Sequence, residues 1–131
     1  MEIRSSYLGG VNPDIQNILN DQDQLEKIAQ QIANDTGNQT AINLDIAKYN
    51  STYAQFSSDQ SKAIADGALP PLTDPFWTQT NNDMSAFSNL VANVIDDARA
   101  GNKDKANTDY STASQQSEQV MIDYLNYHSP V

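Results

Sequence analysis

The stretch that decides the fold is AINLDIAKYNSTYAQFSSDQSKA, residues 41–63. Its core-forming positions recur at alternating intervals of four and three residues, the period of one face of an α-helix. A strand would instead repeat every two residues. The positions on this face are Ile42, Ile46, Tyr49, Tyr53, Phe56, Gln60 and Ala63. The pattern therefore predicts a long helix, which we expect over residues 40–65.

Three other segments show the same helical rhythm, and none alternates with the period of a strand. The first repeats every seven residues at Val11, Ile18, Leu25 and Ile32. The later two run through Trp77, Thr80, Met84, Phe87, Val91, Val94 and Ala98, and through Ala106, Tyr110, Ala113, Ser117, Val120, Tyr124 and Tyr127. We expect helices over residues 13–34, 75–100 and 103–128.

Short segments rich in Gly, Pro, Asn and Asp separate the four helices, at residues 34–38, 66–75 and 101–102. Asn12 before Pro13, and Thr73 or Asp74 before Pro75, can cap two helix starts. Short links favour antiparallel neighbours. The sequence therefore predicts an all-α fold, an antiparallel up-down-up-down four-helix bundle in one domain, residues 1–131.

Size and charge limit the classes of function. A chain of 131 residues is about one ordinary domain. Seven basic against 17 acidic residues give a formal net charge of -10, which would repel a phosphate backbone, so nucleic acid is not an expected partner. There is no cysteine, which removes thiolate chemistry. No apolar run reaches the ~20 residues of a membrane span, and no signal peptide is recognisable.

Catalytic and metal sites are also not expected. A di-iron bundle needs Glu-x-x-His on two helices and two further glutamates, whereas this chain has only Glu2, Glu26, Glu118 and one histidine, His128. His128 has no C-x-x-C-H motif for haem, and no Gly-x-Ser-x-Gly elbow holds a nucleophile. We therefore predict a protein that is not an enzyme, without a metal or cofactor.

Polar residues at helical spacing remain as candidates for binding. An amide-rich strip follows the first expected helix, residues 13–34, and a second polar strip follows the last one, residues 103–128. Amides and hydroxyls both donate and accept hydrogen bonds, so these strips could line a ligand site or a wet homodimer seam, or simply face solvent. The candidate ligand-binding residues are Gln24, Lys27, Gln31, Asn107, Tyr110, Ser111 and Ser114.

Aromatic residues should gather at one end of the bundle. If neighbouring helices run in opposite directions, the start of the third helix and the end of the fourth meet there. The residues concerned are Phe76, Trp77, Tyr124 and Tyr127. They predict either an aromatic plug of the core or a binding pocket.

Residues 84–106, with Met84-Ser85-Ala86-Phe87 at their start and the turn Gly101-Asn102, lead into an amphipathic run that ends at Tyr127. This half resembles the second half of the four-helix-bundle sensor domains of methyl-accepting chemotaxis proteins and related sensor histidine kinases. The resemblance implies an extracytoplasmic, homodimeric domain between two membrane helices that reads a small ligand near its membrane-distal turns. The aspartate-binding members use arginines on the first helix, where this chain has only Lys27.

The expected function is therefore the extracytoplasmic sensor domain of a transmembrane chemoreceptor or sensor kinase. It would bind a small molecule and relay a helix displacement to a cytoplasmic signalling domain. The alternative is a protein–protein interaction bundle without a small ligand, secreted or cytoplasmic. The high negative charge favours neutral or cationic ligands over anions.

Overall fold

The computed structural model describes residues 11–127. These residues form four α-helices and no strand: α2 (Pro13–Asn34), α3 (Gln39–Ala65), α4 (Phe76–Arg99) and α5 (Lys103–Asn126). The predicted all-α class is therefore confirmed. The predicted helix end at residue 128, and His128 itself, lie outside the described residues.

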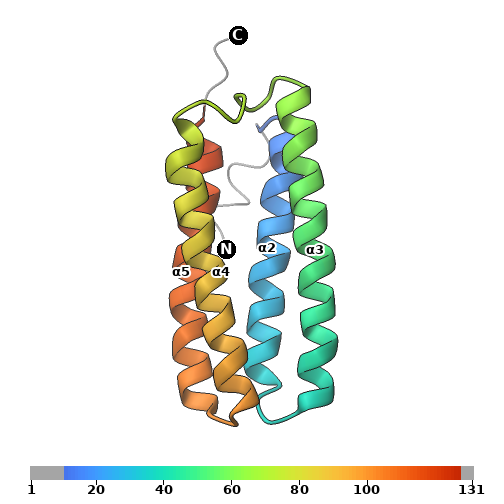
Figure 1. Ribbon diagram of the computed structural model, residues 1–131, viewed down its shortest axis with the longest axis vertical. Helices are drawn as coiled ribbons and strands as arrows, with labels where there is room; N and C mark the ends of the chain where they lie inside the picture. The colour runs from blue at the N-terminus through green and yellow to red at the C-terminus, as the bar shows by residue number, and fades with distance from the viewer. Residues whose placement is uncertain (1–10, 128–131) are drawn as a thin grey trace.

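The four helices lie side by side as a bundle (Figure 1). The most extensive contacts join α2 to α3 and α4 to α5, and α2 also packs along α5. The turns that follow α2 and α4 lie at one end, and the link between α3 and α4 lies at the other (Figure 1). At the first end, the Gly37 N–H donates to the Ala98 carbonyl at 2.9 Å, which ties the two turns together.

The helix ends follow the local chemistry that the sequence indicates. The Asn12 side chain accepts a hydrogen bond from the Asp14 N–H at 2.8 Å, with Pro13 in the first turn of α2. The Asp74 carboxylate accepts the Phe76 N–H at 2.8 Å at the start of α4. After α4, Gly101 has a φ of 78°, a left-handed conformation that side chains with a Cβ rarely adopt.

The core runs between the helices, but α3 contributes less of it than its sequence pattern predicts. Its fully buried apolar residues are Ile42, Phe56 and Ala63, whereas Tyr49 and Tyr53 between them are only half-buried. The physical reason is that α3 packs mainly on α2 and has little contact with α4. The middle of its apolar face is therefore covered mainly by α2, with fewer contacts to α4 and α5.

The aromatic residues do gather where α4 begins and α5 ends. Trp77 and Tyr124 are buried, and their ring centroids lie 6.3 Å apart. The indole N–H of Trp77 donates to the Pro70 carbonyl at 3.0 Å, which anchors the α3–α4 link over the core. Phe76 is only half-buried, and its ring lies 5.1 Å from that of Tyr127. This end is therefore a core plug with an open aromatic edge.

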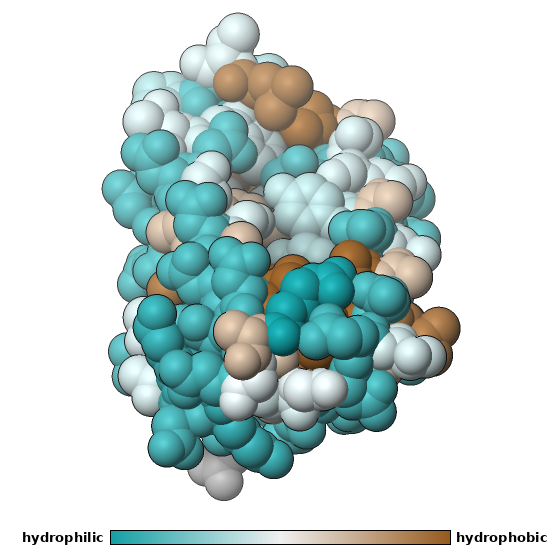
Figure 2. All heavy atoms as spheres, turned by 60° about the horizontal axis from the view of Figure 1, so that its bottom comes forward, coloured by the Kyte–Doolittle hydropathy of each residue, from teal (hydrophilic) through white to brown (hydrophobic). Residues whose placement is uncertain are grey.

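The surface is mostly polar. Figure 2 shows the end that holds the α2–α3 and α4–α5 turns, where hydrophilic residues cover most of the face and hydrophobic ones form small, separate patches. Within the described part of the chain, no helix is both long and apolar enough to cross a membrane.

Candidate functional site

The structure brings three of the predicted ligand-binding residues together. Gln24, Lys27 and Gln31 project from successive turns of α2 and line a shallow hollow of about 230 Å³ against α3. From α3 the hollow receives Asp45 and Lys48. The Lys27 ammonium lies 3.1 Å from the Asp23 carboxylate, and the Gln31 amide donates to Asp35 at 3.2 Å. The hollow is open, Ile28 adds an apolar wall, and Lys27 and Gln31 already bond acids outside its lining.

The four predicted residues on α5 do not line this hollow. Asn107 and Ser111 are exposed, and Tyr110 packs against the core. Ser114 instead donates to the Glu26 carboxylate of α2 at 3.1 Å. The two strips of the sequence analysis therefore serve different places, one between α2 and α3 and the other between α5 and α2 or solvent.

A buried polar contact that the sequence analysis did not single out lies beside that last bond. The Gln22 side chain is fully buried on α2 and donates to the Ser117 hydroxyl of α5 at 2.8 Å. The Gln22–Ser117 pair and the Glu26–Ser114 pair together form a polar seam along the α2–α5 interface. We call these four residues the α2–α5 seam. Because buried polar groups are costly when unpaired, the seam favours one alignment of the two helices.

Paired aspartates join the helices within each of the two most closely packed pairs. Along each helix, the aspartates concerned are separated by seven or fourteen residues, so each set lies on one side of its helix. The pairs are Asp14–Asp66, Asp21–Asp59 and Asp35–Asp45 between α2 and α3, and Asp83–Asp123 and Asp97–Asp109 between α4 and α5.

Four of these pairs contain an enclosed oxygen atom without a hydrogen-bond partner in the described part of the chain. There is one such atom in each of the four pairs: Oδ2 of Asp21, of Asp45, of Asp97 and of Asp123. Two ionised carboxylates can only accept hydrogen bonds, so a pair needs a proton or a cation to bind its two members together. The pairs are therefore sites of either proton or cation uptake.

The pairs differ in their nearby cations. Lys62 contacts Asp14 and Asp66, Lys105 lies 3.6 Å from Asp97, and Lys48 acts on Asp45. No basic side chain of the described residues contributes to the pKa of Asp21 or of Asp123. Two pairs, Asp21–Asp59 and Asp83–Asp123, are therefore left without a cation.

The consequence for protonation is large in these two pairs. Burial raises the pKa of Asp21 to about 7, helped by the hydrogen bond with Asp59. Burial likewise raises the pKa of Asp123 to about 7, helped by Asp83. Burial acts in the same direction on Asp83, but hydrogen bonds from Asp123 and Gln79 outweigh it and lower the pKa of Asp83. Each pair thus holds a proton in mildly acidic solution and releases it as the pH rises through about 7.

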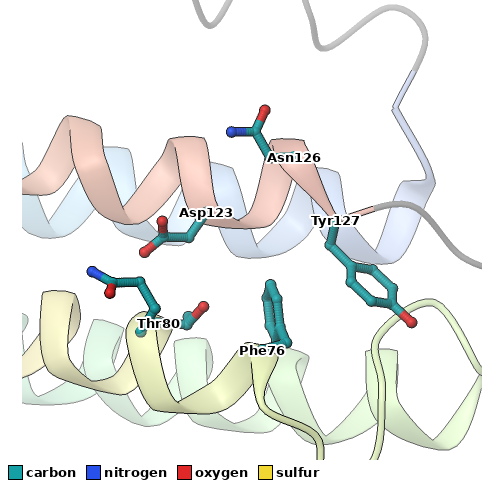
Figure 3. A pocket seen from close by; sticks show the side chains of 6 residues that line it. Phe76, Thr80, Asp123, Asn126 and Tyr127 are labelled. Carbon is teal, nitrogen blue, oxygen red and sulfur yellow. The ribbon is translucent and has the colours of Figure 1, made fainter.

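A pocket of about 260 Å³ opens beside the Asp83–Asp123 pair, between α4 and α5 (Figure 3). Phe76 and Tyr127 form its aromatic side, while Asp123 and Thr80 face each other across the two helices (Figure 3). Gln79 and Asn126 complete the lining. We call this the end pocket. Thr80 is 1% exposed, and its hydroxyl has no hydrogen-bond partner among the described residues.

The aromatic part of the end pocket, Phe76 and Tyr127, was predictable from the sequence, whereas its carboxylate, Asp123, was not among the predicted site residues. The signal was the heptad spacing of the aspartates, which repeats the spacing of the apolar core positions. Spacing on one helix does not reveal which acid on the next helix lies opposite, so the pairs become visible only in the packed structure. Within residues 11–127, no group of three or more His, Cys, Asp or Glu residues could hold a metal ion.

Comparison of the chain with protein-family models, with curated proteins and with solved structures finds no match.

Proposed function

We propose that this chain is the small-molecule-binding sensor domain of a transmembrane chemoreceptor or sensor kinase, extracytoplasmic and homodimeric. The observation that carries the proposal is the α2–α5 seam. It joins the two helices that would continue toward the membrane, and it does so through hydrogen bonds that depend on helix alignment. A ligand that alters this alignment would be read where α2 begins and where α5 ends.

The proposal includes an antiparallel up-down-up-down topology. Its support is the pairing of Asp14 near the start of α2 with Asp66 just after α3, and of Asp35 just after α2 with Asp45 near the start of α3. The Trp77–Tyr124 contact relates the start of α4 to the end of α5 in the same way. With this topology, the start of α2 and the end of α5 lie at one end of the bundle, as two membrane connections require.

The proposed relay is a small shift of α5 along α2. Tightly packed interiors resist deformation, so a helix transmits a displacement rather than absorbing it. The seam holds one alignment in the unliganded state through Gln22 and Ser117, which are both fully buried. A ligand bound at the end of α5 can favour a second alignment only to the extent that it binds that state more tightly.

A ligand screen by thermal shift tests the proposal. We expect at least one of a panel of amines, amino acids, organic acids and purines to raise the melting temperature, because a ligand that binds the native state stabilises it. Spin labels at Asn20→Cys on α2 and Gln115→Cys on α5 should then report a changed distance with that ligand. Absence of any stabilising compound would refute ligand binding. A gene without membrane helices on both sides of residues 1–131 would refute the receptor.

The alternative function is protein docking without a small ligand. Leu44 on α3 favours it, because this side chain is 62% exposed at the edge of a hollow of about 420 Å³ between α2 and α3. Ile28 and Ala47 line this hollow with Leu44, and apolar side chains gathered in one place mark interaction sites where single ones do not. Sedimentation of the wild type and of Leu44→Ser at several concentrations tests self-association through this face. A wild-type dimer that persists in Leu44→Ser would argue against docking through this face, whereas a monomer in both samples would also contradict the homodimer of the first proposal.

A further inference from the structure

Among residues 11–127, no basic side chain acts on the Asp83–Asp123 pair. Both oxygens of Asp83 accept hydrogen bonds from the Gln79 amide, at 3.0 Å each. Asp123 Oδ2 is enclosed and has no partner among the described residues. Among the described residues, Asp83 is the single charged group that contributes to the pKa of Asp123. No charged group on α2 or α3 contributes to it. Within the described part of the chain, the two carboxylates therefore face each other with no positive group opposite them.

The end pocket offers a place for that charge. Asp123 lines it from α5, and the rings of Phe76 and Tyr127 flank the same space. Aromatic faces attract cations, and they favour organic cations whose hydration is weak. The Thr80 hydroxyl adds a second, nearly fully buried polar group without a partner in the described residues. Carboxylate, hydroxyl and aromatic faces together are typical of sites for small ammonium ions.

A metal ion fits this place less well. Hard divalent cations take six or more oxygen ligands, several of them carboxylates. Among the described residues, no cluster of three or more acidic or histidine side chains exists. A volume of about 260 Å³ is also far larger than a bare ion needs, and it suits a molecule of several non-hydrogen atoms.

We propose that the end pocket binds a small organic ammonium ion, whose charge lies against the Asp123 carboxylate and beside the Phe76 and Tyr127 rings. This inference rests on the proposed ligand-binding function and names the ligand class. Where the pair still holds its proton, the exchange is balanced in charge, because one cation enters as one proton leaves to solvent. Binding therefore strengthens as the pH rises toward the range in which the pair releases its proton.

Choline is a suitable probe because its charge does not depend on pH, and 3,3-dimethylbutan-1-ol is its neutral counterpart of the same shape. We expect amide chemical shifts to change around residues 76–80 and 123–127 on titration with choline, and not with the neutral alcohol. Between pH 6 and pH 8 the affinity should rise about tenfold, as the pair loses its proton. Sodium chloride at equal ionic strength controls for screening.

Two matched variants complete the test. Asp123→Asn keeps the size and a hydrogen bond to Asp83 but removes the charge, and it should abolish choline binding. Asp21→Asn makes the same change in the other cation-free pair, which lines none of the pockets described above, and should leave binding unchanged. Equal binding of the neutral alcohol, or choline binding that survives in Asp123→Asn, would overturn the inference.

A pair that takes up only a proton would show pH-dependent shifts but none with choline, ethylamine or putrescine, and this too overturns the inference. The ammonium site and the proposed sensor function can also fail independently of each other. A stabilising ligand that maps to the α2–α3 hollow around Gln24 and Lys27 would retain the sensor proposal while removing the ammonium site. Shifts at the end pocket without a changed α2–α5 distance would retain the site and remove the relay.

Discussion

The Asp21–Asp59 pair allows a quantitative prediction of stability against pH. Replacing Asp21 by Asn removes one of two facing carboxylates and leaves an amide that can donate to Asp59. Because the pKa of Asp21 is raised in the folded protein, the folded state holds a proton that the unfolded chain has released. The free energy of unfolding is therefore undiminished by Asp21 below the ordinary pKa of 3.8. It falls as the pH rises from there to about 7.

The magnitude follows from the size of the shift. A rise from 3.8 to about 7 corresponds to ~4 kcal/mol at ~1.4 kcal/mol per pKa unit. Asp21 is partly exposed, and solvent screens part of this interaction, so about half, ~2 kcal/mol, is a realistic loss at pH 8. Asp21→Asn should recover that ~2 kcal/mol at pH 8 and change stability by less than ~0.5 kcal/mol at pH 4.

Urea unfolding followed by circular dichroism, at constant ionic strength and at both pH values, measures the two differences. Asp96→Asn is the matched control, since it removes an equal charge from an exposed site. It separates the pair from the general effect of a net charge of -10. Equal gains for both variants at pH 8, or a gain for Asp21→Asn that does not depend on pH, would refute the reasoning.

Three further substitutions probe the parts of the fold that position these sites. Gln22→Ala should cost about 2–3 kcal/mol in urea unfolding, because it leaves a cavity and removes the donor to Ser117; a loss below ~0.5 kcal/mol would mean that the seam is not stabilising. Trp77→Phe should cost about 1–2 kcal/mol through the lost hydrogen bond to the Pro70 carbonyl, and increased proteolysis in residues 66–75 is the expected readout. Gly101→Ala should cost ~1 kcal/mol from backbone strain alone, because the added Cβ meets no atom within 4 Å; a higher melting temperature would contradict this.

Helix positions were predictable because they depend on neighbours close in the chain. The three-and-four spacing in residues 41–63 and the caps at Asn12 and Asp74 are local signals, and the structure has a helix or a cap at each. The spacing also put Tyr49 and Tyr53 on the core face, and both do pack against the core, although each stays half-buried. Periodicity shows which face of a helix is apolar, but the depth of cover over that face depends on how close the next helix lies.

The candidate sites depend mainly on the tertiary structure. Aspartates at heptad spacing can be read from the sequence, but an acid facing solvent and an acid facing another acid look the same along one helix. Only the alignment of α4 against α5 places Asp123 opposite Asp83 and beside Phe76. The chain by itself thus determined an acidic, all-helical protein, and the packing of its helices decided which acids lie opposite one another and which of them line a pocket.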